Sequence, residues 1–172
     1  ILETLEPAVD GGTQTAVLDV GQRVQTINDT RLASLRTGSA ETGTAAGNAG
    51  GITAWAQAYG QKANQGTADG IEGYDANTVG GMIGFDSAEI IPNGILGVSI
   101  NYGNSNIDSD NANTTETDID SYGFNVYGSV NVAPQTFVAG QVGYAYNNID
   151  GVRHDVGAAG INANGSYSSN QY

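Results

Sequence analysis

The side chains that could do chemistry are few in this chain, and they are scattered. His154, the only histidine, stands between Arg153 and Asp155 in a polar stretch, where a hydrolytic site is conceivable. A lone histidine in such a stretch is far more often a solvated side chain, and one imidazole without any cysteine does not make a metal site. The sequence therefore predicts no catalytic residue, no metal and no cofactor, and an enzyme is not expected.

Carboxylates gather in the segment from Asp108 to Asp120. Its start is similar to that of an EF-hand loop, but Ala112 takes the fifth position and Ile119 stands where the bidentate Glu belongs. A solvated charged loop is the favoured interpretation, and weak Ca²⁺ binding stays open as the alternative. The candidate ligands for that alternative are Asp108, Asp110, Glu116, Asp118 and Asp120.

Net charge and hydropathy exclude two further classes of protein. The chain has 18 acidic and 5 basic side chains, a formal charge of −13, and so acidic a protein repels the phosphates of nucleic acids. No stretch of about 18 apolar residues occurs, so a transmembrane helix is not expected either.

An amphipathic helix is predicted over residues 13–37, between an extended lead-in at 1–12 and a flexible connector at 38–51. Apolar residues recur in it at three- and four-residue steps, namely Val17, Val20, Val24 and Ile27. Gly38 can end this helix in the left-handed conformation. The helix also carries Arg31 and Arg36, which would need partners or water if the helix were enclosed.

After Ile52 the apolar period changes to two, which is typical of β-strands. Strands joined as consecutive hairpins are predicted over residues 53–61, 77–86, 94–103, 118–130 and 136–147, with the start of a sixth at 166–172. One face of these strands is small or polar and the other is apolar. The residues expected on the apolar face are Val79, Ile83, Phe85, Leu96, Val98, Ile100, Phe124, Val126, Val138 and Val142.

A soluble sandwich would turn that apolar face into a core, whereas a membrane barrel would turn it towards lipid. Connections that alternate between long and short, and strands of about ten residues, favour the barrel. Aromatic residues near the strand ends are expected to form girdles at the two membrane interfaces. The expected girdle residues are Trp55, Tyr102, Tyr122, Tyr144, Tyr146 and Tyr167. The small inner face leaves room for a helix.

Several motifs in order resemble the autotransporter β-domain, the translocator family of type V secretion. The segment from Trp55 to Gly60 resembles its first-strand motif Trp-x-Gln-x-x-Gly, and the segment from Arg31 to Gly38 is similar to the end of its pore-spanning helix. Later strands carry further matches at Gly73–Thr78, Leu96–Val98, Asp120–Tyr122, Tyr127–Gly128 and Gly143–Tyr144.

The resemblance implies an outer-membrane anchor that exports and displays an N-terminal passenger at the surface of a Gram-negative-type bacterium, with its long loops extracellular. Residues 13–37 would span the pore and residues 52–172 would form the first half of the barrel translocator. Expected partners are the lipid bilayer, the passenger, and the remaining barrel strands or a barrel-assembly machine. Some members cleave their passenger at an Asn-Asn pair in this helix. Thr26-Ile27 align with that pair and the nearby Asn28-Asp29 is offset from it, so self-cleavage is not expected here.

The expected fold is thus all-β: a transmembrane antiparallel up-and-down β-barrel, partial with five strands and the start of a sixth, preceded by a helix in the lumen. Five or six strands cannot close a lipid-facing barrel, so the open edges are expected to need further strands. The alternative function is that of an outer-membrane pore, or of a protease with its site at the barrel rim, that takes no part in secretion.

Overall fold

A computed structural model describes residues 12–39, 44–67, 73–109, 115–156 and 161–172. One helix, α1 (Gly12–Thr37), precedes seven strands in the described part of the chain. The strands are β1 (Thr44–Ala49), β2 (Ile52–Gln65), β3 (Tyr74–Ser87), β4 (Gly94–Ser109), β5 (Thr115–Ala133), β6 (Thr136–Val156) and β7 (Ile161–Gln171).

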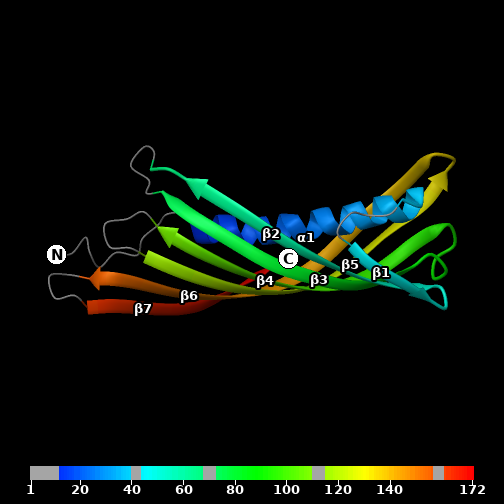
Figure 1. Ribbon diagram of the computed structural model, residues 1–172. Coiled ribbons are helices and arrows are strands. Elements are labelled where there is room, and N and C mark those ends of the chain that lie inside the picture. The colour runs from blue at the N-terminus through cyan, green and yellow to red at the C-terminus, as the bar shows by residue number, and fades with distance from the viewer. Residues whose placement is uncertain (1–11, 40–43, 68–72, 110–114, 157–160) are drawn as a thin grey trace.

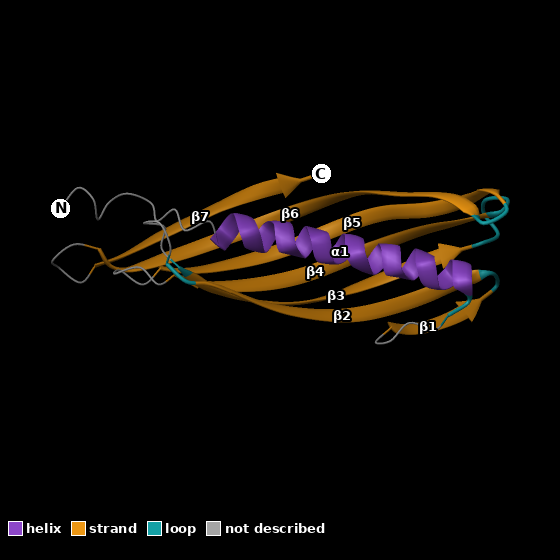
Figure 2. Cartoon of the chain, turned by 90° about the horizontal axis from the view of Figure 1, so that it is seen from above, coloured by secondary structure: helices purple, strands orange, loops and turns teal. Residues whose placement is uncertain are grey.

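The strands form one antiparallel sheet in which every strand pairs with its neighbours in sequence, in the order β1-β2-β3-β4-β5-β6-β7. Figure 1 shows the sheet as a curved trough, and Figure 2 shows α1 lying lengthwise along it, roughly parallel to the strands. The predicted up-and-down antiparallel architecture behind a helix is confirmed. The one helix of the described residues, α1, is not both long and apolar enough to cross a bilayer.

Three sequence expectations about the strands need correction. Residues 44–49, expected in a flexible connector, form the additional strand β1, because the adjacent Gly50 and Gly51 adopt positive φ angles of 59° and 75° and close a tight hairpin. The strands also run well into the stretches expected to be long loops, and β6 reaches Val156. The polar residues of these extensions still form backbone pairs with the neighbouring strands. The stub expected at 166–172 begins earlier, at Ile161.

The core lies between α1 and the inner face of the sheet, in two clusters along the helix. One is built around Val20, Val24, Ile27 and Leu32 with Trp55, Met82, Ile95 and Tyr127. The other joins Ala16 to Tyr74, Ala76, Ile107, Ile119 and Ile149. The apolar stripe of the helix therefore packs on a limited set of large inward side chains set among small and polar strand positions, and the apolar residues of the outer face point away from it.

Candidate functional site: the helix against the inner face

The most buried charges of the described residues lie where α1 meets β3. Arg31 and Asp86 form a two-pronged ion pair, with Nε donating to Oδ2 at 2.8 Å and Nη2 donating to Oδ1 at 3.1 Å. Both side chains are almost fully buried. Two charges taken out of water are costly unless they are paired and further hydrogen-bonded, so this pair fixes the position of α1 along the sheet.

Two aromatic side chains complete the shell of that ion pair. Tyr127 donates its hydroxyl hydrogen to Asp86 Oδ2 at 3.2 Å, and the Trp55 indole Nε1 donates to the Tyr127 hydroxyl oxygen at 2.8 Å. The two rings meet edge to face with centroids 6.4 Å apart, and the Arg31 guanidinium lies 5.9 Å from the Trp55 ring centre. Trp55, Tyr127, Asp86 and Arg31 are called the anchor network below.

The expectation that Trp55 belongs to an outer aromatic girdle is wrong. Trp55 is only 3% exposed and points towards the helix, because its indole N–H finds a partner in Tyr127 and its ring lies over Gly84. Asp86 was not singled out from the sequence, and Tyr127 was named only as part of a family motif, without this role. The sequence did contain a signal for Asp86. It is a single carboxylate at the alternate positions of β3 that otherwise carry mostly small residues, and the preceding helix carries the cation Arg31.

One turn before Arg31, an amide joins the helix to the middle of the sheet. Asn28 is fully buried; its Oδ1 accepts from the Ser99 hydroxyl at 3.2 Å and its Nδ2 donates to Gln141 Oε1 at 3.1 Å. Gln141 Nε2 in turn donates to Asp29 Oδ1 at 3.2 Å. Polar groups of the helix are thus matched by polar groups on β4 and β6, as burial requires.

The second helix charge expected inside, Arg36, has a different partner. Its guanidinium carbon lies 3.9 Å from the centre of the Phe137 ring, a cation–π contact near the β5–β6 turn. Phe137 pairs with Asn131 of β5, which lies two residues after the buried Ser129 and therefore on the same, inner face of that strand. Phe137 faces inward for the same reason. Arg36 therefore marks the end of the helix that lies beside the short turns.

Glycines of the inner face leave the space that the inward aromatic rings occupy. A Cβ at Gly84 would lie 2.6 Å from the Trp55 ring, and one at Gly97 would collide with the ring of Tyr127. These close approaches leave no room for a side chain.

Replacing Gly97 by alanine should therefore destabilise the domain by about 1–3 kcal/mol, because the rigid Tyr127 ring would have to move and disturb its bond to Asp86. The free energy of unfolding by urea in lipid vesicles measures the effect. Gly140→Ala is the matched control, since a Cβ there meets nothing within 4 Å. Equal stability of the two variants would contradict the role assigned to Gly97.

The outer face of the sheet carries an apolar band across β3–β6. All ten residues expected on the apolar face lie there, opposite the helix; eight are exposed and Leu96 and Val126 are partly covered by neighbours. Val142, at 70% exposure, is the extreme case. So large an exposed apolar surface marks an interaction surface.

Tyrosines border this band on the side away from the short turns. Tyr102, Tyr122, Tyr144 and Tyr146 face outward, and the rings of Tyr102 and Tyr122 are 5.2 Å apart. Tyr167 was expected with them but lies on the inner face. Its partner in the register is Ile149, which is buried beside the helix, so Tyr167 points to the same side while remaining 57% exposed at the sheet edge.

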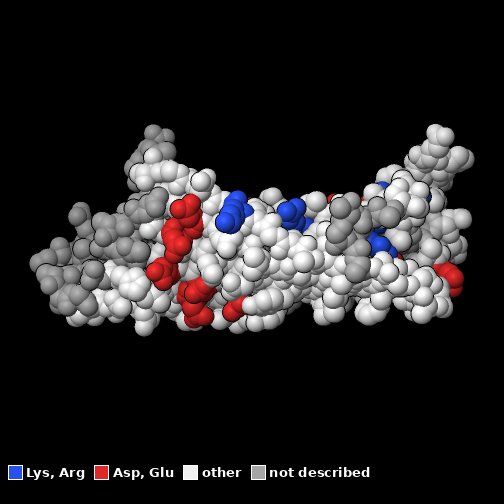
Figure 3. Space-filling view, viewed as in Figure 1, with Lys and Arg blue, Asp and Glu red and all other residues white. Residues whose placement is uncertain are grey.

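Beyond the tyrosines the outer face becomes polar and acidic. Figure 3 shows Asp and Glu side chains gathered towards one end of the surface, with a broad uncharged area beside them. Asp75 stands directly opposite Asp108, and Asp118 opposite Asp150. This polar continuation of the strands is called the collar below.

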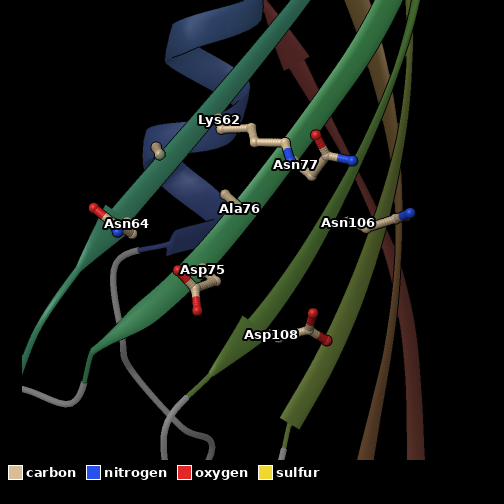
Figure 4. A pocket seen from close by; sticks show the side chains of 8 residues that line it. Lys62, Asn64, Asp75, Ala76, Asn77, Asn106 and Asp108 are labelled. Atoms are coloured by element: carbon tan, nitrogen blue, oxygen red, sulfur yellow. The ribbon is translucent and has the colours of Figure 1, made fainter.

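The collar contains a shallow hollow of about 520 Å³ on β2–β4. Figure 4 shows Lys62, Asp75 and Asp108 among its lining side chains, drawn from three neighbouring strands. All three are exposed. The described residues contain no group of three or more His, Asp or Glu side chains arranged to hold a metal.

The remaining chemical candidates of the sequence lie on the polar parts of the strands or outside the described residues. Asp110 and the side chain of Asp155 lie outside the described residues. Asp120 accepts hydrogen bonds from the Tyr102 hydroxyl at 2.7 Å and from Asn104 Nδ2 at 3.1 Å. His154 lies in β6, not in a loop, with Nε2 3.8 Å from Glu116 Oε1.

Comparison with known proteins decides between a soluble and a membrane interpretation of these two faces. The model of the autotransporter beta-domain family matches residues 54–172. The chain belongs to this family. The autotransporter beta-domain family is a translocator family of the outer membrane rather than an enzyme family, which agrees with the apolar outer band and with an inner face covered by α1.

A relative of this autotransporter domain is Outer membrane protein B of Rickettsia prowazekii (strain Madrid E), 29% identical over 163 residues. The alignment covers 85% of this chain and 10% of that protein, so the chain spans about a tenth of the length of the curated relative it matches. No solved structure matches the chain.

Proposed function

We propose that this autotransporter domain exports and anchors an N-terminal passenger, with α1 as the segment that joins passenger to barrel. The ten outward apolar residues contact the hydrocarbon of the outer membrane. The inner face surrounds α1, and additional strands at the sheet edges complete the barrel wall, because unpaired backbone groups are not tolerated in hydrocarbon.

The direction of α1 is the observation that carries the proposal. The Gly12 end of the helix packs against Tyr74 and Ile107, beside the collar. Its Arg36 end contacts Phe137 beside the β5–β6 turn. The N-terminal end of α1 therefore lies at the collar end of the trough, and its C-terminal end lies beside the short turns.

Features of the outer face support one orientation of the domain in the membrane. The Tyr102–Tyr122 pair lies where the apolar band gives way to the acidic collar, as at a membrane interface. Since outer-membrane barrels have short periplasmic turns and longer extracellular connections, we place the collar outside the cell and the short turns in the periplasm. The passenger is then displayed on the surface.

An epitope placed before α1 in the full-length protein tests this orientation. We expect antibody to bind it on intact cells. An epitope in the two-residue β5–β6 turn at 134–135 is the control and should become accessible only after the outer membrane is permeabilised. The opposite labelling pattern would contradict the proposed orientation.

Deleting residues 12–37 separates export from the alternative of a simple pore or rim protease. An export unit loses surface display of the epitope while the barrel, followed by its heat-modifiable band, still reaches the membrane. A pore that merely resembles the family would keep its conductance properties unchanged, since it has no use for α1. Conductance that rises on deletion favours the export unit, because α1 fills the interior.

A further inference from the structure

The strand β1 is a short edge strand that a tight turn joins to β2. It pairs antiparallel with the first six residues of β2, from Ala49↔Ile52 to Thr44↔Gln57. Gly50 and Gly51, at φ of 59° and 75°, form the two-residue turn between them. Such a turn suits the right-handed twist of a hairpin, so this pairing is encoded locally.

As a wall strand in a membrane, however, β1 is poorly equipped. It has six residues, whereas β2–β6 have between 14 and 21 and a bilayer-spanning strand needs about 9–11. Its outward positions include Gly47 and Ala49, with none of the bulk that the outer band shows in Val98 or Phe124. It can neither cross the hydrocarbon nor cover it.

The position of β1 is also specific. The family match begins at residue 54, inside β2, so β1 lies outside the matched domain and on the edge of that domain's first strand. It covers residues 52–57 of this edge; among the described residues no strand pairs with 58–65 on the same side. One side of β2 can hold only one partner strand at a given position.

We propose that β1 is a removable edge cap: it occupies the pairing edge of β2 before the barrel closes, and the closing strand displaces it. The idea rests on the proposed membrane barrel. In water the cap protects an edge that would otherwise recruit other strands. A closing strand that spans the bilayer forms more ladder hydrogen bonds with β2 than six residues can, and it supplies the apolar outer side chains that β1 lacks.

A disulfide between Asn48→Cys and Thr53→Cys tests the exchange in the full-length protein. These residues face each other across the hairpin, and Asn48 Nδ2 already donates to Thr53 Oγ1 at 3.1 Å. Residues 1–172 contain no native cysteine that could pair with the introduced ones. The matched control is Thr78→Cys with Ser105→Cys, a contacting pair on β3 and β4 that stays paired throughout.

Refolding into lipid vesicles is followed by the heat-modifiable band and by protection from protease. Oxidised N48C/T53C should give at least about tenfold less closed barrel than the same protein with reductant. The disulfide keeps β1 on the edge of β2, so the closing strand cannot displace it. The oxidised control should close like the wild type. Closure of the locked protein to the same extent as the control would overturn the proposal.

A turn variant adds a second, opposite expectation. Gly50→Ala places a Cβ that meets no atom within 4 Å, but the residue is strained at φ 59°, so the variant weakens the β1–β2 turn without touching the barrel wall. It should close at least as fast as the wild type, and a marked loss of closure would also overturn the edge cap. Failure of the wild type itself to insert into vesicles would instead contradict the proposed membrane function.

Discussion

Replacing Asp86 by asparagine is expected to destabilise the domain by about 3–5 kcal/mol, because Arg31 would remain buried without its counter-charge. Tyr127 would also lose a charged acceptor. Unfolding by urea in lipid vesicles gives the free energy, and single-channel conductance reports whether α1 leaves the trough. We expect a higher conductance in this variant.

The double variant D86N/R31M identifies the cause of that loss. Since it removes both charges and keeps much of their volume, most of the lost stability should return. Glu116→Gln is the control for charge removal as such; its contact with His154 is exposed and should contribute about 0–1 kcal/mol. A D86N effect no larger than that of Glu116→Gln would mean that the anchor network does not hold the helix.

The second large effect concerns the outer face. Val98→Lys, in the middle of the apolar band on β4, is expected to destabilise by about 2–4 kcal/mol in a bilayer, because the ammonium group would be buried in hydrocarbon. The measurement is again the free energy of unfolding in lipid vesicles.

Asn106→Lys is the matched control for this substitution. Asn106 lies on the same face of the same strand but in the collar, and it is exposed. The cost there should be about 0–1 kcal/mol, as near an interface. Equal costs at the two positions would show that the outer band does not face lipid.

Much of the fold could be predicted from the sequence because its signals are local. Alternation of apolar with small residues fixes which strand face is which without reference to any neighbour, and Val98, Ile100 and Phe124 lie on the outer face as expected. The three- and four-residue spacing in α1 fixes its buried stripe in the same way. The Gly50-Gly51 hairpin was missed although its signal is local too.

The aromatic residues show where local pattern fails. Trp55 and Tyr167 have the residue type and the position near strand ends that suit a girdle, yet both face inward. For Trp55 the decision comes from Gly84 on the next strand, which leaves room for the ring, and from Tyr127, which accepts its N–H. These partners are 29 and 72 residues away in sequence, and only strand register brings them together.

By itself, the sequence determined the class of this protein. It showed strands with one apolar and one small face, a helix that could lie along the small face, and the motifs of the autotransporter domain in order. Only the tertiary structure decided which charges meet. Arg31 and Arg36 look alike in sequence, but Arg31 pairs with Asp86 and Arg36 lies on Phe137. The reason is physical: burial of a charge is paid for by a partner whose position depends on the rotation of the helix and the register of the sheet together.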